Sequence, residues 1–155
     1  MPKGERLPYH EAAIGLLSQV GCQCSTINSG NLFVQKNRRN LYINIAGKKL
    51  PYYGRDGRPA FPWETHIKPN RLDKIEKEAK KYNAEPWLAF CYAIFDEKYL
   101  RNFTHTVKIN NISFGIRLIG TSDFKQAMKP RSPSWVAVDL PRKQVLNLTY
   151  DIDII

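Results

Sequence analysis

The side chains with the clearest chemical potential are cations that gather in one stretch of the chain. The sequence has 24 lysines and arginines against 14 aspartates and glutamates, a formal net charge of +10. Such cations bind phosphates and release the counterions condensed on nucleic acid. The aromatic residues Tyr52, Tyr53, Phe61 and Trp63 lie among them, and aromatic rings can stack on exposed bases. The pattern predicts binding of nucleic acid, with DNA expected, through these side chains: Lys36, Arg38, Arg39, Lys48, Lys49, Arg55, Arg58, Lys68 and Arg71.

The same features have plainer interpretations. The aromatic side chains could cover the edge of a sheet and point inward, which we expect for Trp63 at least as much as stacking on bases. The positive charge could instead serve solubility or docking to an acidic partner, as in a protein-interaction module without enzymatic activity. A salt-sensitive shift with branched DNA separates these classes of function. A second basic set could extend the surface: Lys125, Lys129, Arg131, Arg142 and Lys143.

The cysteines and histidines do not indicate a metal centre or a disulfide framework. There are 3 of each, and neither set has the spacing of zinc ligands. An odd number of cysteines also argues against an oxidising compartment, so we expect free thiols. No apolar run approaches the roughly 20 residues that a membrane span requires, and the charged segment Met1–Arg6 is unlike a secretory signal. We therefore expect a cytoplasmic protein that does not enter a membrane.

Periodicity predicts a helix followed by strands in the N-terminal part of the chain. Tyr9–Val20 has apolar side chains at helical spacing, and Gly21 then favours a helix end. Short β-like runs follow at Cys24–Asn28, Leu32–Gln35 and Leu41–Ala46, which predicts a meander.

The middle of the chain continues with an irregular segment, a helix and a strand. Leu50–Pro69 is rich in proline, glycine and aromatic residues, which predicts an ordered but irregular excursion beside the sheet. Asn70–Asn83 has helical periodicity, with lysines such as Lys74 on its solvated face. Trp87–Phe95 is a nearly continuous apolar run, typical of a central strand buried on both faces. The resulting order is αβββαβ, an α/β core over about residues 9–96 with a mixed central sheet.

The rest of the chain predicts extra C-terminal strands over about residues 103–155, within a single domain that spans 1–155. We expect a hairpin, a short helix capped by Ser122 and two late strands. The hairpin is expected over Thr104–Ile109 and Ser113–Ile119, and the helix over Ser122–Met128. The two late strands are expected over Trp135–Leu140 and Val145–Leu148.

The order αβββαβ and the local sequence patterns resemble those of the PD-(D/E)XK nucleases, and among them the archaeal-type Holliday junction resolvases. Those enzymes have a glutamate on the first helix, an aspartate that opens the second strand and a Glu-x-Lys tripeptide on the third. The corresponding positions here are Glu11, Asn31, Asn44 and Ala46. The resemblance implies a restriction-endonuclease-like fold, phosphodiester cleavage with Mg²⁺ or Mn²⁺ as cofactor, and a homodimer that engages branched DNA.

This chain departs from the family pattern where the chemistry would occur. Asn31 and Asn44 replace the two carboxylates, and Ala46 replaces the lysine. Hard divalent cations need anionic oxygen ligands, whereas an amide brings a dipole without the charge that offsets dehydration of the ion. The lysine would have oriented water or stabilised the developing phosphorane charge, which alanine cannot do. We therefore expect a degenerate site that holds no metal, with Glu11 as the one retained residue.

Three explanations of the altered motif stay open. The chain can be a natural pseudo-nuclease that keeps the binding surface, which we favour. It can be an active endonuclease whose ligands have migrated, with Glu64, Glu76, Lys48 and Lys49 as candidates and Mg²⁺ or Mn²⁺ as cofactor. It can also be a chain in which the residues were deliberately replaced.

The resemblance makes a geometric prediction. Asn31 and Asn44 should lie on adjacent strands with their side chains on the same side, and Glu11 should face them from the first helix. If the fold is instead an unrelated small α+β domain, these asparagines are ordinary turn and strand-edge residues and Glu11 is a solvated carboxylate near a helix N-terminus. For the homodimer, the late strands are the expected contact.

Overall fold

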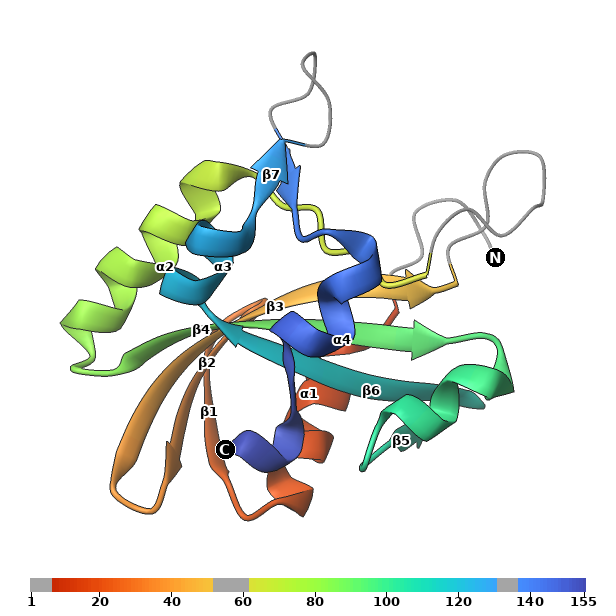
Figure 1. The fold of residues 1–155 in the computed structure, drawn as a ribbon. Helices are drawn as coiled ribbons and strands as arrows, with labels where there is room; N and C mark the ends of the chain where they lie inside the picture. The colour runs from red at the N-terminus through yellow and green to blue at the C-terminus, as the bar shows by residue number, and fades with distance from the viewer. Residues whose placement is uncertain (1–6, 52–61, 131–136) are drawn as a thin grey trace.

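The chain folds around one mixed β-sheet with helices on both faces (Figure 1). The structure, a computed structural model, describes residues 7–51, 62–130 and 137–155. In this part of the chain the seven-stranded sheet has the order β1-β2-β3-β4-β6-β5, and β9 pairs with β6 outside that path. Its strands are β1 (Gln23–Asn28), β2 (Asn31–Lys36), β3 (Arg39–Leu50), β4 (Glu85–Ile94), β5 (Val107–Ile109), β6 (Ile112–Gly120) and β9 (Tyr150–Asp151). A separate short ribbon pairs β7 (Lys129–Pro130) with β8 (Val138–Asp139).

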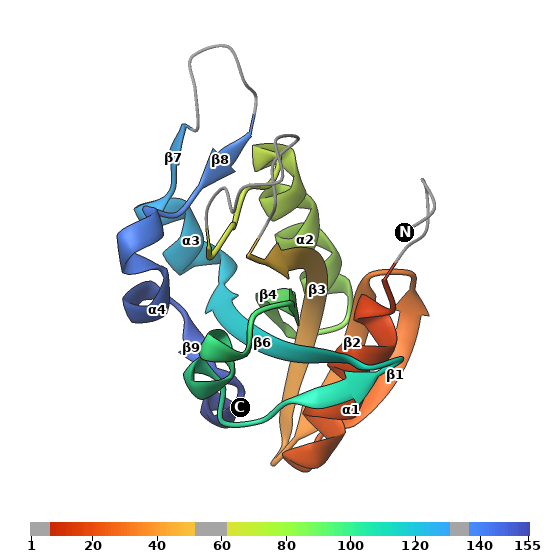
Figure 2. The same ribbon diagram turned by 90° about the vertical axis from the view of Figure 1, so that its right-hand side faces the viewer.

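The first elements follow one another as α1-β1-β2-β3-α2-β4, so the predicted αβββαβ order is confirmed. The helices are α1 (Tyr9–Gln19), α2 (Pro69–Lys81), α3 (Thr121–Ala127) and α4 (Val145–Leu148). Strand β3 pairs with β4 in parallel, while β1/β2, β2/β3 and β4/β6 are antiparallel. Parallel neighbours need a crossover connection, and α2 forms part of it. Helices α2 and α3 cover one face of the sheet and α1 covers the other (Figures 1 and 2).

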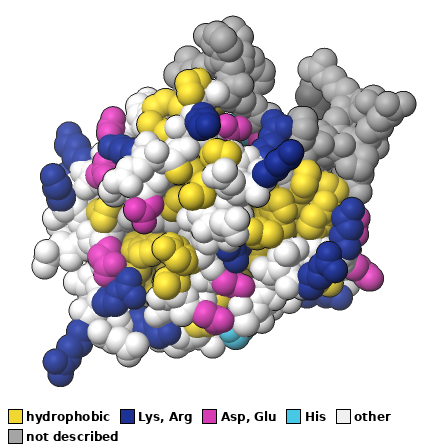
Figure 3. All heavy atoms as spheres, in the orientation of Figure 1, with side chains coloured by type: hydrophobic (Ala, Val, Ile, Leu, Met, Phe, Trp, Pro, Cys, Tyr) yellow, Lys and Arg dark blue, Asp and Glu magenta, His cyan; other side chains and the backbone are white. Residues whose placement is uncertain are grey.

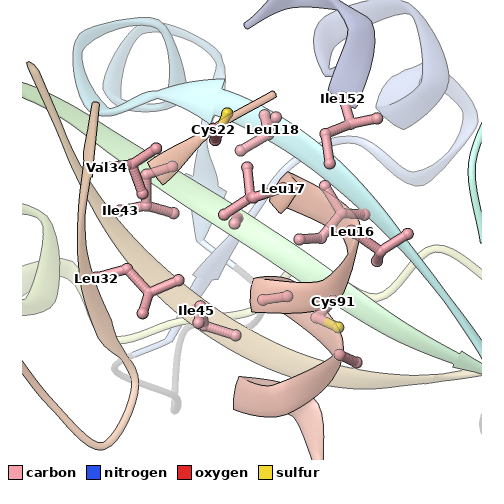
Figure 4. Close-up of a cluster of buried hydrophobic side chains, with 14 of the residues drawn as sticks. Leu16, Leu17, Cys22, Leu32, Val34, Ile43, Ile45, Cys91, Leu118 and Ile152 are labelled. Carbon is pink, nitrogen blue, oxygen red and sulfur yellow. The ribbon is translucent and has the colours of Figure 1, made fainter. Parts of the chain in front are cut away.

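The face covered by α1 has an aliphatic core (Figure 4). Leu16 and Leu17 of α1 are fully buried against side chains such as Leu32 of β2 and Ile43 of β3. Alternate residues of these strands point to this face, which is why apolar residues occupy every second position of the strands. Helix α1 ends where Gly21 adopts a positive φ of 86°, as its position after the last apolar residue predicts.

The opposite face has an aromatic core. Helix α2 buries Leu72, Ile75 and Ala79, and beneath them lie Phe90 and Tyr92 of β4. The residues of β4 from 88 to 94 are all buried, so the expectation of a central strand covered on both faces is confirmed. The two cores together anchor β3 and β4, the strands on which the candidate site depends.

Asparagine-rich turns set the register of the hairpins. The β2/β3 loop is Asn37-Arg38 and the β5/β6 loop is Asn110-Asn111, with positive φ at every residue. Two-residue loops of this kind match the twist of antiparallel strands, and asparagine tolerates the left-handed conformation. The predicted hairpin near residues 104–119 is therefore confirmed, with β5 shorter than expected.

The C-terminal part differs from the prediction in several places. Val145–Leu148 is the helix α4 and not a strand, because a short apolar run does not distinguish the two, and Thr149 Oγ1 donates to Val145 O at its end. Helix α3 begins after Gly120 and has no side-chain cap, so the expected capping by Ser122 is wrong. The strand expected over residues 135–140 is limited to β8 in the described part, since 131–136 lie outside it.

Gly115 in β6 provides a test of this packing. A Cβ atom at Gly115 would collide with the ring of Phe103, which is itself buried. Gly115→Ala should therefore lower the free energy of unfolding by about 1–3 kcal/mol, the usual range for overpacking. The matched control is Gly120→Ala at the end of the same strand. A Cβ atom there would lie 3.9 Å from Asp123 Oδ2, an ordinary van der Waals contact, and should change stability by less than about 0.5 kcal/mol. Equal urea unfolding midpoints for the two variants would contradict the packing described.

Candidate nucleic-acid interface

Asn31 and Asn44 face each other across β2 and β3. They are direct partners in the antiparallel register, and Asn44 Nδ2 donates to Asn31 Oδ1 at 2.7 Å. Asn31 Nδ2 in turn donates to Asn28 Oδ1 at 2.6 Å. The prediction that the two asparagines lie on adjacent strands, on the same side, is confirmed. Two amides satisfy each other in this position, whereas two carboxylates would need a cation between them.

Arg71 of α2 completes this chain of hydrogen bonds. Its Nε donates to Asn44 Oδ1 at 2.7 Å, and its Nη2 donates to Ile45 O at 2.9 Å. Burial lowers the pKa of the Arg71 guanidinium, yet an arginine stays protonated in proteins. Each amide oxygen of the pair therefore already accepts a hydrogen bond, and the nearest charge is positive. Such a site disfavours a divalent cation and suits an anion.

Ala46, at the position that the resemblance equates with a catalytic lysine, lies in the core. Ala46 is 3% exposed and lies in the aromatic core on the side covered by α2. Asn44, two residues earlier, points to the same side of β3. The alanine therefore contributes packing and no polar chemistry.

The residue of α1 that reaches the site is His10, where we expected Glu11. Gly30 N donates to His10 Nδ1 at 3.3 Å, and the other ring nitrogen of His10 lies 3.0 Å from Thr26 Oγ1. Glu11 is exposed. The buried face of α1 includes Ala13, and a residue three positions before it shares that face, which selects His10 and turns Glu11 outward. Sequence reasoning missed His10 because its spacing matched no ligand pattern.

A hollow of about 520 Å³ lies over this end of the sheet. His10, Gly30, Asn44, Lys49 and Arg71 are among the residues that line it. Within the described part of the chain, its lining contains two cations and no carboxylate. This hollow is called the amide pocket below.

A second hollow of about 460 Å³ lies between β3 and the start of α2. It is called the lysine pocket below, and its polar lining consists of Lys48, His66, Lys68, Asn70, Arg71 and Lys74. Arg71 lines both hollows, so the two are neighbours. Lys74 is exposed, as the sequence predicts, and its position beside Lys48 and Lys68 in the lysine pocket distinguishes it from the other lysines of the helix.

The remaining predicted cations do not belong to this region. Arg38 and Arg39 lie at the opposite end of β3, about 30 Å along the strand from Lys48 at 3.3 Å per residue. Arg39 also donates through Nε and Nη2 to Glu85 at 3.0 and 2.9 Å, and these bonds lower the pKa of Glu85. Lys36 pairs with Arg39 in the register and lies at the same far end. The expectation that all these residues flank one cleft is therefore wrong.

Of the aromatic residues proposed to stack on bases, Trp63 lies among the described residues. Tyr52, Tyr53 and Phe61 lie outside the described residues, as do Arg55 and Arg58. Trp63 is buried, and its ring packs edge-on against Tyr92 and Tyr99. The inward orientation considered for Trp63 is confirmed, so this ring is not available to stack on bases.

Among the described residues, the candidate migrated ligands Glu64, Glu76 and Lys48 are engaged with other partners. Glu64 is buried and its Oε2 lies 2.6 Å from His66 Nδ1, while Lys48 Nζ donates to His66 O at 2.7 Å. Glu76 pairs with Lys125 on the far side of α2. Among the described residues, no group of three or more His, Cys, Asp or Glu side chains could hold a metal ion.

In the second basic set, the charge of Lys125 is used in ion pairs within the protein. Lys125 is paired with Asp73 and Glu76, and Arg131 lies outside the described residues. On the face drawn in Figure 3, Lys and Arg side chains are spread among acidic ones. Within the described residues, the amide and lysine pockets are two hollows whose linings contain cations and no carboxylate.

Comparison with protein-family models, with curated proteins and with solved structures finds no match to this chain. None of the helices in residues 7–51, 62–130 and 137–155 is long and apolar enough to cross a membrane.

Proposed function

We propose that this protein binds nucleic acid, with DNA the expected ligand, through a core related to the PD-(D/E)XK nucleases whose metal site has become a cationic one. The observation that carries the proposal is Arg71. Its guanidinium bonds to Asn44 in the pair that the resemblance equates with the metal-binding carboxylates. Positive charge that a nuclease of this pattern obtains from a metal ion would here come from the protein.

The chemistry follows from replacing an ion with a guanidinium. Either can attract a phosphate. Arg71 already donates through Nε to Asn44 Oδ1 and through Nη2 to Ile45 O, so its remaining N–H groups on Nη1 and Nη2 are the donors that can bind phosphate oxygens. A guanidinium has no open coordination position and does not lower the pKa of a bound water, so it cannot generate a hydroxide nucleophile as a metal does. The protein should bind nucleic acid and leave it uncut.

The arrangement of elements supports the same relationship. The meander β1-β2-β3, the crossover through α2 and the parallel pairing of β3 with β4 fit the core that the resemblance implies. The paired asparagines occur at the strand positions where that core would hold its carboxylates. The restriction-endonuclease-like fold is therefore part of the proposal.

The proposal is tested by the salt dependence of binding. A fluorescein-labelled four-way DNA junction with hydroxyl ends should bind with an affinity that falls linearly in log–log form as NaCl rises, because phosphate contacts release counterions. Lys49→Ala should reduce the slope by about 0.9, the value for one phosphate contact on duplex DNA. Arg38→Asn, at the far end of β3, should leave the slope unchanged, and asparagine tolerates the positive φ at that position.

Fluorescence anisotropy over a range of salt concentrations gives the affinity and the slope of its salt dependence. Absence of salt-dependent binding to the junction, to duplex and to single-stranded DNA would contradict the proposal. Equal competition by polyglutamate would favour the protein-interaction module instead.

A further inference from the structure

The lysine pocket has features that a flat phosphate-binding surface does not need. It is concave, and its described lining contains four cations, one histidine and no acid. The Lys48 Nζ bond to His66 O links β3 to the segment before α2. Ile67 then bridges to Val138, which fixes the same segment from its other side. The walls of the pocket are therefore held by the fold rather than by surface side chains alone.

Two further features direct the pocket toward an anion. Helix α2 begins at Pro69, and its N-cap residue Lys68 makes no side-chain capping bond, so the positive end of the helix dipole adds to the charge of the lysines. The His66 ring is oriented through Nδ1 by the buried Glu64. Nε2 of His66 has no hydrogen-bond partner among the described residues and is left for a ligand.

We propose that the lysine pocket binds a phosphate monoester, and that the terminal phosphate of a nucleic-acid strand is its source. This inference rests on the proposed function. A terminal phosphate carries a charge of about −1.5 to −2 at pH 7, whereas each backbone phosphate carries about −1, so the concentrated cations favour the terminal group. Because Arg71 lines both pockets, a strand whose end enters the lysine pocket can place a following phosphate at the amide pocket.

The experiment compares strands that differ only in their ends. Single-stranded oligonucleotides of one sequence, with an internal fluorescein, carry a 5′-phosphate, a 3′-phosphate or hydroxyls at both ends. The unaltered protein should bind one of the phosphorylated strands roughly fivefold to tenfold more tightly than the hydroxyl strand, as expected for added charge-assisted hydrogen bonds. Adenosine monophosphate serves as a competitor that lacks the rest of the strand.

Matched variants show whether the preference arises in the lysine pocket. Lys68→Ala with Lys74→Ala should abolish the preference for a terminal phosphate, and both lysines are exposed, so the fold should tolerate the change. The control is Lys77→Ala with Lys108→Ala, which removes the same charge at exposed positions outside the pocket and should retain the preference.

Each outcome separates this inference from the proposed function. Equal, salt-dependent binding of all three strands would overturn the terminal-phosphate inference and leave nucleic-acid binding intact. Binding of adenosine monophosphate that depends on Lys68 and Lys74, without binding of any strand, would support a phosphate-monoester pocket, overturn the nucleic-acid source and contradict the proposed function. Retention of the preference in the Lys68→Ala, Lys74→Ala variant would overturn the assignment to this pocket.

Discussion

Replacing Arg71 by methionine should weaken DNA binding about tenfold or more and reduce the salt slope by about one. Arg71 is the one residue among those described that lines both the amide and the lysine pockets. Methionine keeps an unbranched apolar stem of similar length and removes the guanidinium. The loss should exceed that of any exposed lysine, because a partly buried cation is less screened by solvent.

Controls separate lost binding from lost folding. Arg71→Met removes the donor to Asn44 Oδ1, so its urea unfolding must be measured beside its affinity. Lys77→Met on the exposed side of α2 is the matched control and should change affinity much less. Arg71→Lys keeps the charge without the forked donors and should give an intermediate affinity. If folded Arg71→Met binds the junction as Lys77→Met does, the guanidinium is not the centre of the interface.

The order of elements and the pairing of the asparagines could be predicted from the sequence because both follow from local rules. Apolar residues at a period of two place Leu32 and Ile43 on one face and so fix Asn31 and Asn44 on the other. The turn residues Asn37 and Asn110 then limit the hairpins to short loops and hence to one register. The resemblance proposed that Asn31 and Asn44 pair, and the alternation of apolar residues in both strands supported it.

The charges at the site could not be predicted in the same way, because they depend on contacts distant in the sequence. Strand β3 extends to Leu50, beyond the expected end at Ala46, and this places Lys48 and Lys49 on the sheet rather than in a loop. Because β3 is this long, Arg39 at its start lies far from Lys48 and Lys49 near its end. Nothing in the sequence indicates that Arg71 turns inward, since a single arginine in the first turn of a helix is usually solvated. Whether His10 or Glu11 faces the sheet depends on where the helix begins, because a shift of one residue turns a different side chain inward. Helix boundaries predicted from sequence are uncertain by at least one residue.

The hydrogen bonds that link Asn28, Asn31, Asn44 and Arg71 explain why these side chains can pack together without a metal ion. Asn28, Asn31 and Asn44 each donate or accept along one line that ends at Arg71. No described buried side-chain nitrogen or oxygen lacks a hydrogen-bond partner. A site built for a divalent cation would leave carboxylates facing each other when the ion is absent, and like charges directly opposite on paired strands are destabilising. Affinity for nucleic acid in this protein should therefore not depend on a bridging metal.

The most direct measurement compares one labelled four-way junction in Mg²⁺, in Mn²⁺ and in EDTA at matched ionic strength. The proposed site predicts that binding in EDTA is at least as tight as in either metal, because Lys49 and Arg71 supply the positive charge and divalent ions compete for the DNA phosphates. It also predicts intact DNA after long incubation with a molar excess of protein, since no residue of the amide pocket can activate water through a metal. Gel analysis of the same samples gives the cleavage result.

Binding that is lost in EDTA, or robust cutting that requires Mg²⁺ or Mn²⁺, would contradict a metal-free binding site. Glu64→Gln and Glu76→Gln would then be the first variants to examine for migrated ligands. Undiminished affinity in EDTA together with uncut junction is the result that the Arg71 and asparagine geometry predicts.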